Sequence, residues 1–196
     1  SRRKLRMHSG MLSDGFIELA DAGALDMDFL HKTCVLVGSK HFYQRAKEIG
    51  QLYVAGCDVT HDARLLLELD RFVAVNSALE VDLFGQCNLE HVNGAAVSGA
   101  GGAPDFARAG RLSAGGCSVV ALQAKHKHGS RIVPVLSGNA VASLSRVDVD
   151  YVVTEFGVAK LAGASVHERA AAIIDVAAPE FRSELHDAWR AIAAKL

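Results

Sequence analysis

Residues 72–108 read FVAVNSALEVDLFGQCNLEHVNGAAVSGAGGAPDFAR, and the order of signals in this stretch decides the fold. The apolar run Phe72–Val75 predicts a strand, and a polar, extended segment around Gly85 follows it. A glycine-rich loop then leads into a helix that Pro104 is expected to open, because proline is pre-organised for the first helical turn. Since glycines allow close approach of the backbone, we expect the free N–H groups of this loop to point at a ligand.

The glycine loop does not fit a dinucleotide site. Pro104 stands where the third glycine of the dinucleotide fingerprint belongs, and the next predicted strand leads to Gln123 instead of an acid that would bind a ribose. Asp105 in the first helical turn also disfavours a doubly charged phosphate. A carbonyl oxygen that becomes an oxyanion fits this loop better than a phosphate does. The alternative is a tight turn whose glycines only let helix and sheet pack.

Strand and helix signals alternate along the rest of the chain, which predicts an α/β fold with an open, mostly parallel sheet flanked by helices. We expect one compact domain. The predicted elements upstream are a helix that Ser13 or Asp14 caps and that ends at Gly23, a strand at Thr33–Val37, a helix from Ser39 to Glu48, a strand at Leu52–Ala55 and a helix at Ala63–Leu69 capped by Asp62. The predicted elements downstream are an antiparallel hairpin of Cys117–Leu122 with Arg131–Leu136, a last strand at Tyr151–Thr154, a helix behind the capping box of Ser165 and Glu168, and a closing helix at Phe181–Leu196.

Composition indicates a soluble, cytoplasmic protein. The chain has 196 residues, half of them hydrophobic, and a formal net charge of −1, so neither a nucleic-acid surface nor a membrane span is expected. The basic stretch Ser1–Arg6 is expected to be a solvated tail. The four cysteines (Cys34, Cys57, Cys87 and Cys117) form no C-x-x-C pair, which favours buried thiols in a reducing compartment over zinc.

Isolated polar residues give weaker signals. Lys125–His128 holds two histidines without a nearby carboxylate, which is typical of a solvated loop and not of a metal site, so no metal is expected. None of the serines at or near glycines (Ser9, Ser98, Ser113 and Ser137) has the strand-to-helix elbow of a hydrolase. Carboxylates near predicted strand ends are candidate acids, bases or nucleophiles: Glu80, Asp82, Glu90, Asp105 and Glu155.

Taken together, these stretches resemble the C-terminal domain of the acetyl-CoA hydrolase/transferase family, particularly its 4-hydroxybutyrate CoA-transferase-like branch. The resemblance covers nearly the whole of residues 1–196. It rests on motifs in one order: His8–Gly15, Gly38–Lys40, Asn76–Asn88, Ser98–Arg108, Ser130–Pro134, Val152–Lys160, Glu168–Ala171 and Pro179–Arg182.

The resemblance implies an open α/β fold of the CoA-transferase (NagB/RpiA-like) type, without a permanently bound cofactor. Family members are about twice this length, so it also implies an N-terminal domain that these residues lack, and a homodimer. The substrates would be a short-chain acyl-CoA thioester, such as acetyl-, butyryl- or 4-hydroxybutyryl-CoA, and a small carboxylate. Substrate-binding positions in this sequence would be Gln86, Asn88, Ser98, Gly99, Gly101 and Gly102.

The sequence departs from the family at the position of the nucleophile. A family glutamate attacks the thioester and forms an acyl anhydride, which keeps the acyl group activated, but Gly10 stands at this position. A family asparagine aligns with His61. Three interpretations remain open: His61 polarises the thioester carbonyl or activates a water, Glu90 or Glu155 replaces the lost carboxylate, or the chain is a CoA-binding, catalytically degenerate homologue. The alternative role of His61 is a helix-start residue that bonds backbone, and that of Gly10 is a turn.

Overall fold

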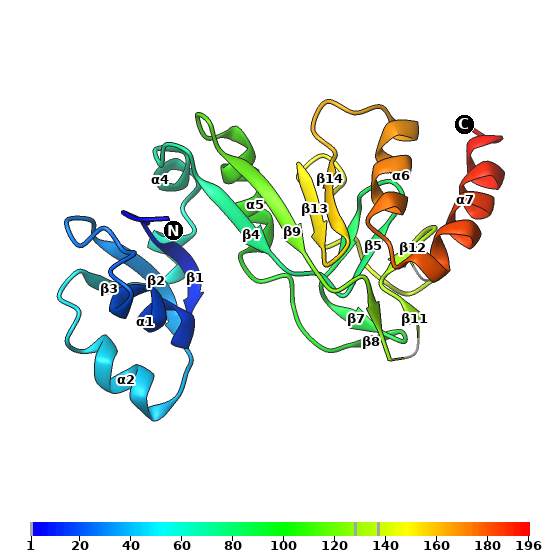
Figure 1. Cartoon of the computed structure of the whole chain (residues 1–196). Helices are drawn as coiled ribbons and strands as arrows, with labels where there is room; N and C mark the ends of the chain where they lie inside the picture. The colour runs from blue at the N-terminus through cyan, green and yellow to red at the C-terminus, as the bar shows by residue number, and fades with distance from the viewer. Residues whose placement is uncertain (1, 128, 137) are drawn as a thin grey trace. The chain divides into compact units, whose positions relative to one another are not determined.

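The computed structural model describes residues 2–127, 129–136 and 138–196, and the chain divides into two compact units (Figure 1). Unit 1 is Ser1–Leu65 and unit 2 is Leu66–Leu196. The sequence predicted one compact domain, whereas contacts are concentrated within each unit. Ser1, His128 and Ser137, which belong to the tail, histidine and serine candidates above, lie outside the described residues.

Unit 1 is a parallel three-stranded sheet in the order β1-β2-β3 with short helices (Figure 1). Its core contains Leu12, Phe16, Leu25 and Phe42, which are all buried. Its strands are β1 (His8–Leu12), β2 (His31–Leu36) and β3 (Leu52–Val54), and its helices are α1 (Asp14–Asp21), α2 (Lys40–Ala46) and α3 (Cys57–Thr60). Helix α4 (Ala63–Leu67) spans the boundary between the units.

Side chains at the helix starts explain why α1 and α2 begin where they do. The prediction for Ser39 is confirmed, because its Oγ accepts a hydrogen bond from the Phe42 N–H. Ser13 precedes α1 but makes no capping bond. The Asp14 carboxylate instead accepts hydrogen bonds from the Ser39 N–H and hydroxyl, and thereby ties α1 to α2.

Unit 2 is built on a four-stranded sheet in the order β14-β13-β9-β4, in which β4, β9 and β13 are parallel and β14 is antiparallel. Helix α5 packs on β4 and β9, α6 packs on β14, and α7 packs on α6 (Figure 1). Val120, Val152, Leu161 and Ile173 lie in the core between sheet and helices. The elements are β4 (Val73–Asn76), α5 (Ala103–Leu112), β9 (Cys117–Ala121), β13 (Tyr151–Thr154), β14 (Gly157–Lys160), α6 (Val166–Asp175) and α7 (Pro179–Ala193). The predicted fold class, a mostly parallel α/β fold flanked by helices, is confirmed.

Three short sheets complete unit 2. Strand β5 pairs with β12 in parallel and with β6 in antiparallel fashion, while β7 with β8 and β10 with β11 form antiparallel hairpins. Their bounds are β5 (Glu80–Asp82), β6 (Cys87–Asn88), β7 (His91–Val92), β8 (Ala95–Ala96), β10 (Lys125–His126), β11 (Gly129–Ser130) and β12 (Ile132–Val133).

Several sequence predictions about the strands and cysteines are wrong. Strand β9 does not form a hairpin with Arg131–Leu136, because β4 and β13 occupy both of its edges. Tyr151–Thr154 is not the last strand, since β14 follows it. Buried thiols were expected, but only Cys87 is buried, and Cys57 is exposed. Burial, reinforced by the nearby Asp82, raises the pKa of the Cys87 thiol.

Gly110 sets the distance between α5 and the sheet. A Cβ atom at this position would lie 2.8 Å from the Cys117 carbonyl oxygen and 2.9 Å from the Ala74 Cβ. Only glycine therefore allows α5 to approach β4 and β9 this closely. This contact holds the axis of α5, and with it the loop that precedes the helix.

We predict that Gly110→Ala destabilises the protein by about 1–3 kcal/mol, because the added methyl group would collide with the Cys117 carbonyl oxygen and the Ala74 Cβ in a packed core. Gly15→Ala is the matched control, since Gly15 is also helical but a Cβ there has nothing within 4 Å. That substitution should be neutral or stabilise by up to about 1 kcal/mol. Urea unfolding of both variants measures the difference, and equal effects would contradict the close-approach role of Gly110.

Candidate functional site

The glycine loop presents unpaired backbone donors at the start of α5. The helix begins at Ala103, one residue before Pro104, and Gly101 adopts a positive φ of 54°. The Ala103 N–H bonds to the Ala100 carbonyl oxygen. Across the described residues, the N–H groups of Gly99, Gly101 and Gly102 have no hydrogen-bond acceptor. Gly99 and Gly101 are exposed, so these donors are open to a ligand at the positive end of the helix.

The segment before the loop is held by the backbone of Glu90. Its carbonyl oxygen accepts hydrogen bonds from the Val97 N–H at 2.7 Å and from the Ser98 N–H at 3.3 Å. The Ser98 hydroxyl donates to the Gly99 carbonyl oxygen at 3.1 Å. Between these residues, Asn93 and Gly94 both have positive φ, which is typical of the turn in a tight hairpin. Ser98 thus supports the loop with both its amide and its hydroxyl group.

The two predicted carboxamides, Gln86 and Asn88, are engaged with the protein. Gln86 Nε2 donates to Asp82 Oδ2 at 2.8 Å. The buried Asn88 amide donates to His91 O at 2.7 Å and to Glu80 Oε2 at 3.2 Å, and its oxygen accepts from two backbone N–H groups. Asn88 therefore shapes the chain that leads to the glycine loop.

Asp82 is a fully buried carboxyl group inside this turn. Burial raises its pKa, although the N–H groups of Phe84 and Gln86 and the Gln86 amide all bond to it. The turn between β5 and β6 is built around these bonds. We interpret Asp82 as a structural residue of the site.

Asn76 is a polar residue that sequence reasoning did not select. It ends β4, and its Nδ2 group is buried without a partner among the described residues. Because α5 returns the chain from the end of β4 to the start of β9, the carboxyl end of β4 and the glycine loop lie at the same edge of the sheet. Ligands of open α/β sheets bind at this edge. In the sequence, the amide residue Asn76 directly follows the apolar run Phe72–Val75, and this position at a strand end is the signal that could have identified it.

Gly10 lies in the middle of β1, so its interpretation as a turn is wrong. Its neighbours pair in parallel with β2, through Ser9 with Thr33 and Met11 with Val35. Side chains alternate along a strand, so a side chain at position 10 would share the face of His8.

His8, Thr60 and His61 form a polar cluster in unit 1. His8 Nε2 donates to the Thr60 carbonyl oxygen at 2.8 Å, and Thr60 Oγ1 lies 2.8 Å from His61 Nδ1. The single Thr60 hydroxyl proton goes to the Gly56 carbonyl oxygen, so we assign the proton of the His61 ring to Nδ1. His61 Nε2 is then the basic nitrogen. His61 follows the last residue of α3, and its ring bonds a hydroxyl group, which differs from the helix-start role considered above.

The two candidate replacement carboxylates differ in surroundings. Glu90 Oε1 accepts a hydrogen bond from the Ser143 hydroxyl at 2.7 Å, and the side chain is half-buried. Glu155 is exposed, and its Oε2 accepts from the Ala124 N–H at 2.8 Å. Both belong to unit 2, whereas Gly10 and His61 belong to unit 1.

Neither a metal-binding cluster nor a membrane-spanning helix is found among the described residues. Within residues 2–127, 129–136 and 138–196, no group of three or more His, Cys, Asp and Glu side chains has the arrangement to hold a metal ion. Over the same residues, no helix has both the length and the hydropathy needed to cross a bilayer.

Comparison with known proteins identifies the family of the chain. Residues 38–189 match the acetyl-CoA hydrolase/transferase C-terminal domain. The chain is 35% identical over 198 residues to the 4-hydroxybutyrate coenzyme A transferase of Clostridium kluyveri, covering 97% of this chain and 46% of the relative. It is 36% identical over 197 residues to the succinyl-CoA:cyclohexane-1-carboxylate CoA transferase of Geobacter metallireducens, covering 96% of this chain and 45% of that relative. The crystal structure of RipA from Yersinia pestis superposes with a TM-score of 0.91 at 31% identity, covering 98% of this chain and 45% of that one.

The fold is therefore that of the CoA-transferases. The chain belongs to the acetyl-CoA hydrolase/transferase family and corresponds to its C-terminal domain. It spans less than half the length of these relatives.

Unit 1 should lose stability as the pH falls below about 6.5. Burial lowers the pKa of His8, with Lys32 and His61 lowering it further, and burial also lowers the pKa of the fully buried His31. Because both folded-state values lie below the ordinary value of 6.5, the unfolded chain binds more protons in this window and the free energy of unfolding decreases.

Urea unfolding at pH 7.5, 6.5 and 5.5 measures this loss of stability. His8→Gln, which retains an N–H donor for the Thr60 carbonyl oxygen, should reduce the pH dependence, while His41→Gln on the exposed surface should not. An unchanged midpoint of the native protein across this range would contradict the neutral, buried state of the two histidines.

Proposed function

We propose that the chain acts in an acyl-CoA:carboxylate CoA-transferase or an acyl-CoA hydrolase that uses a short-chain acyl-CoA such as acetyl-, butyryl- or 4-hydroxybutyryl-CoA. The observation that carries this proposal is the set of open N–H groups of Gly99, Gly101 and Gly102 before α5. The C. kluyveri relative, named for CoA transfer to or from 4-hydroxybutyrate, supports the substrate class.

The glycine loop would bind the thioester carbonyl oxygen. As a nucleophile adds to the thioester carbon, negative charge develops on this oxygen, and fixed donors stabilise that charge without reorganising. The positive end of α5 adds to the effect. The buried Asn76 amide at the same sheet edge provides a further donor. In this assignment, Asn88 and Ser98 support the chain that leads to the loop, and Gln86 holds the turn between β5 and β6, through the bonds described above.

His61 would be the general base of a hydrolase. Within unit 1, its Nδ1–H is held by the Thr60 hydroxyl, and a neutral imidazole oriented in this way can take a proton from a water molecule that attacks a thioester. The carbon–sulfur bond then breaks, and the CoA thiolate leaves with the carboxylic acid as the other product. Gly10 offers no side chain on β1, where the family has its nucleophilic glutamate.

Two alternatives to a hydrolase with His61 as its base are a transferase with another nucleophile and an inactive CoA-binding protein. A transferase could use Glu90 or Glu155 as the nucleophile, and the half-buried Glu90 is better positioned by its bond to Ser143. A CoA-binding homologue without activity is favoured by one observation, the absence of a side chain at Gly10. In every case, the length of the relatives supports an N-terminal domain as partner, and we propose a cytoplasmic homodimer.

Product analysis distinguishes these functions. A hydrolase releases free thiol from acetyl-, propionyl- or butyryl-CoA without an acceptor acid, a transferase requires the acceptor, and a binder does neither but is stabilised thermally by CoA. For a hydrolase, His61→Ala should lower kcat by roughly a hundredfold or more, because a general base contributes about that factor. Unchanged turnover would exclude His61 as the base.

Restoring the family carboxylate tests the role of position 10. We predict that Gly10→Glu raises acceptor-dependent CoA transfer by at least about tenfold, which corresponds to roughly 1.4 kcal/mol of barrier. Gly10→Gln is the matched control, because its side chain has the same size but cannot form an anhydride. Equal activities of the two variants would contradict the assignment of Gly10 to the nucleophile position.

A further inference from the structure

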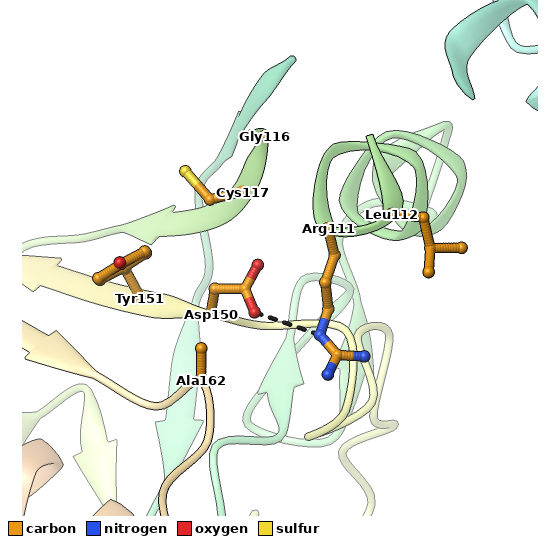
Figure 2. A pocket seen from close by; sticks show the side chains of 7 residues that line it. All are labelled: Arg111, Leu112, Gly116, Cys117, Asp150, Tyr151 and Ala162. Carbon is orange, nitrogen blue, oxygen red and sulfur yellow. Dashed lines mark hydrogen bonds and ion pairs between the residues drawn. The ribbon is translucent and has the colours of Figure 1, made fainter. Parts of the chain in front are cut away.

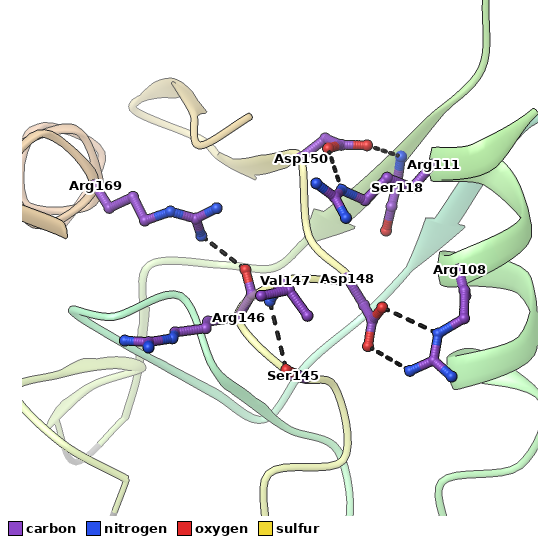
Figure 3. A network of polar contacts seen from close by, with 9 residues as sticks. All are labelled: Arg108, Arg111, Ser118, Ser145, Arg146, Val147, Asp148, Asp150 and Arg169. Atoms are coloured by element: carbon purple, nitrogen blue, oxygen red, sulfur yellow. Dashed lines mark hydrogen bonds and ion pairs between the residues drawn. The ribbon is translucent and has the colours of Figure 1, made fainter. Parts of the chain in front are cut away.

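One face of the four-stranded sheet of unit 2 is packed with helices. Helix α5 covers β4 and β9, and α6 covers β14, on the side where Ala74 and Ala159 are buried. Polar contacts fix α5 to this side, because Arg111 Nε donates to Asp150 Oδ1 at 3.2 Å (Figure 3). The Ser118 N–H donates to the other Asp150 oxygen at 2.9 Å. The residues that alternate with these along the strands point to the other face.

The opposite face of the sheet is apolar and exposed. Val75 on β4 is 66% exposed, and Val158 on β14 is 64% exposed. On the central strands, Val119, Tyr151 and Val153 are only half-buried. The registers place these side chains on one face, since Val119 pairs with both Val75 and Tyr151, and Val153 pairs with Val158. Because largely parallel sheets are covered on both faces, this face is expected to have a further packing layer.

Shape and charge are found at the margins of this face. A pocket of about 300 Å³ lies where β9 and β13 begin, and Cys117, Tyr151 and Leu112 are among the residues that line it (Figure 2). Figure 2 shows the Cys117 thiol pointing away from α5, which carries Arg111. Lys160 on the edge strand β14 pairs with Tyr151 and adds a charge. A concave point and a charged rim are typical of a surface that binds another protein domain.

The size of this face favours a partner in the same polypeptide over a second copy of the chain. Strands of four or five residues, spaced about 4.8 Å apart, give roughly 250 Å² of flat surface. A stable complex of separate chains buries about 800 Å² on each partner. A domain joined by the chain needs a smaller contact, because the linker raises its effective concentration to about the millimolar range.

The relatives contain enough further chain for such a domain. The matched region is 46% of the C. kluyveri relative and 45% of the G. metallireducens relative, so more than half of each lies outside it. The matched family model is that of a C-terminal domain, which places a preceding domain before it. On the sheet, Val75 directly precedes Asn76. A layer on this face would therefore end beside the edge that carries the glycine loop.

We propose that the exposed face formed by Val75, Val119, Tyr151, Val153 and Val158 is the docking surface for an N-terminal domain of the same polypeptide. The inference rests on the N-terminal domain that the proposed function includes. Docking removes the exposed valines from water and gives the sheet its second covering layer. It also brings atoms of the second domain to the sheet edge at which the acyl group is proposed to bind.

Cysteine labelling with N-ethylmaleimide, followed site by site with peptide mass spectrometry, tests this docking. Val75→Cys and Val158→Cys report on the two outer strands of the sheet. Ala191→Cys is the matched control, because it is exposed on α7, which packs on α6 at the covered side. In residues 1–196 alone, the two reporters should react about as fast as the control.

The full-length polypeptide, in which the N-terminal domain precedes these residues, should give a different result. Both reporters should react at least about tenfold more slowly than in residues 1–196, because a docked face is labelled only when it opens locally. The rate for Ala191→Cys should not change. Protection of both reporters in a full-length protein without CoA transfer or hydrolysis would refute the proposed function and support the docking surface.

Three outcomes would overturn the docking proposal. The first is equal labelling of the reporters in the two forms, and the second is a parent polypeptide without a preceding domain. The third is slow labelling of the reporters already in residues 1–196. In that case, a rate that falls as protein concentration rises would identify a second copy as the occupant, and a constant rate would identify another part of this chain.

Discussion

The close packing of α5 against β4 and β9 is the constraint on which the functional features of unit 2 depend. At Gly110 the helix approaches the sheet so closely that no Cβ fits. With its axis fixed, α5 carries the glycine loop at its first residue and Arg111 in its last turn. One helix therefore places open amides at one edge of the sheet and a guanidinium at the other.

The chemistry at the two edges differs because the ends of the helix differ. At the start of α5, unpaired N–H groups favour an oxygen that gains negative charge. At the end of α5, the Arg111 side chain forms an ion pair with Asp150. The first edge suits a reacting carbonyl group, whereas the charged group at the second edge is already paired.

The fold was predictable from sequence where local signals were strong. The alternation of apolar runs and caps gave the parallel α/β class, and Ser39 and the capping box of Ser165 with Glu168 were located correctly. Pairing partners were not predictable, because β9 reads as an apolar strand whichever strands lie beside it. Strand β1 is not evident from sequence because His8, Ser9 and Gly10 hide its apolar pattern, whereas Asn93-Gly94 is a readable signal for the β7–β8 hairpin.

The site was predictable only in part. Glycine spacing and Pro104 indicate the loop, but no sequence pattern indicates that Gln86 bonds to Asp82 and that Asn88 bonds to Glu80 and His91. Such contacts depend on how a turn folds back on itself, which residue order alone does not specify. The grouping of His8 with Thr60 and His61 likewise joins positions about fifty residues apart in sequence, and no local pattern links them.

The central claim, that the amides of Gly99, Gly101 and Gly102 receive the acyl oxygen, is tested most directly by nuclear magnetic resonance. The ligand would be a butyryl-CoA analogue in which a methylene group replaces the thioester sulfur, so that the carbonyl is retained and no turnover occurs. We predict that the three glycine N–H resonances move downfield on binding, as expected for new hydrogen bonds to the carbonyl oxygen. If the analogue raises the melting temperature while these three resonances stay in place, the loop does not bind the acyl group and the account is wrong.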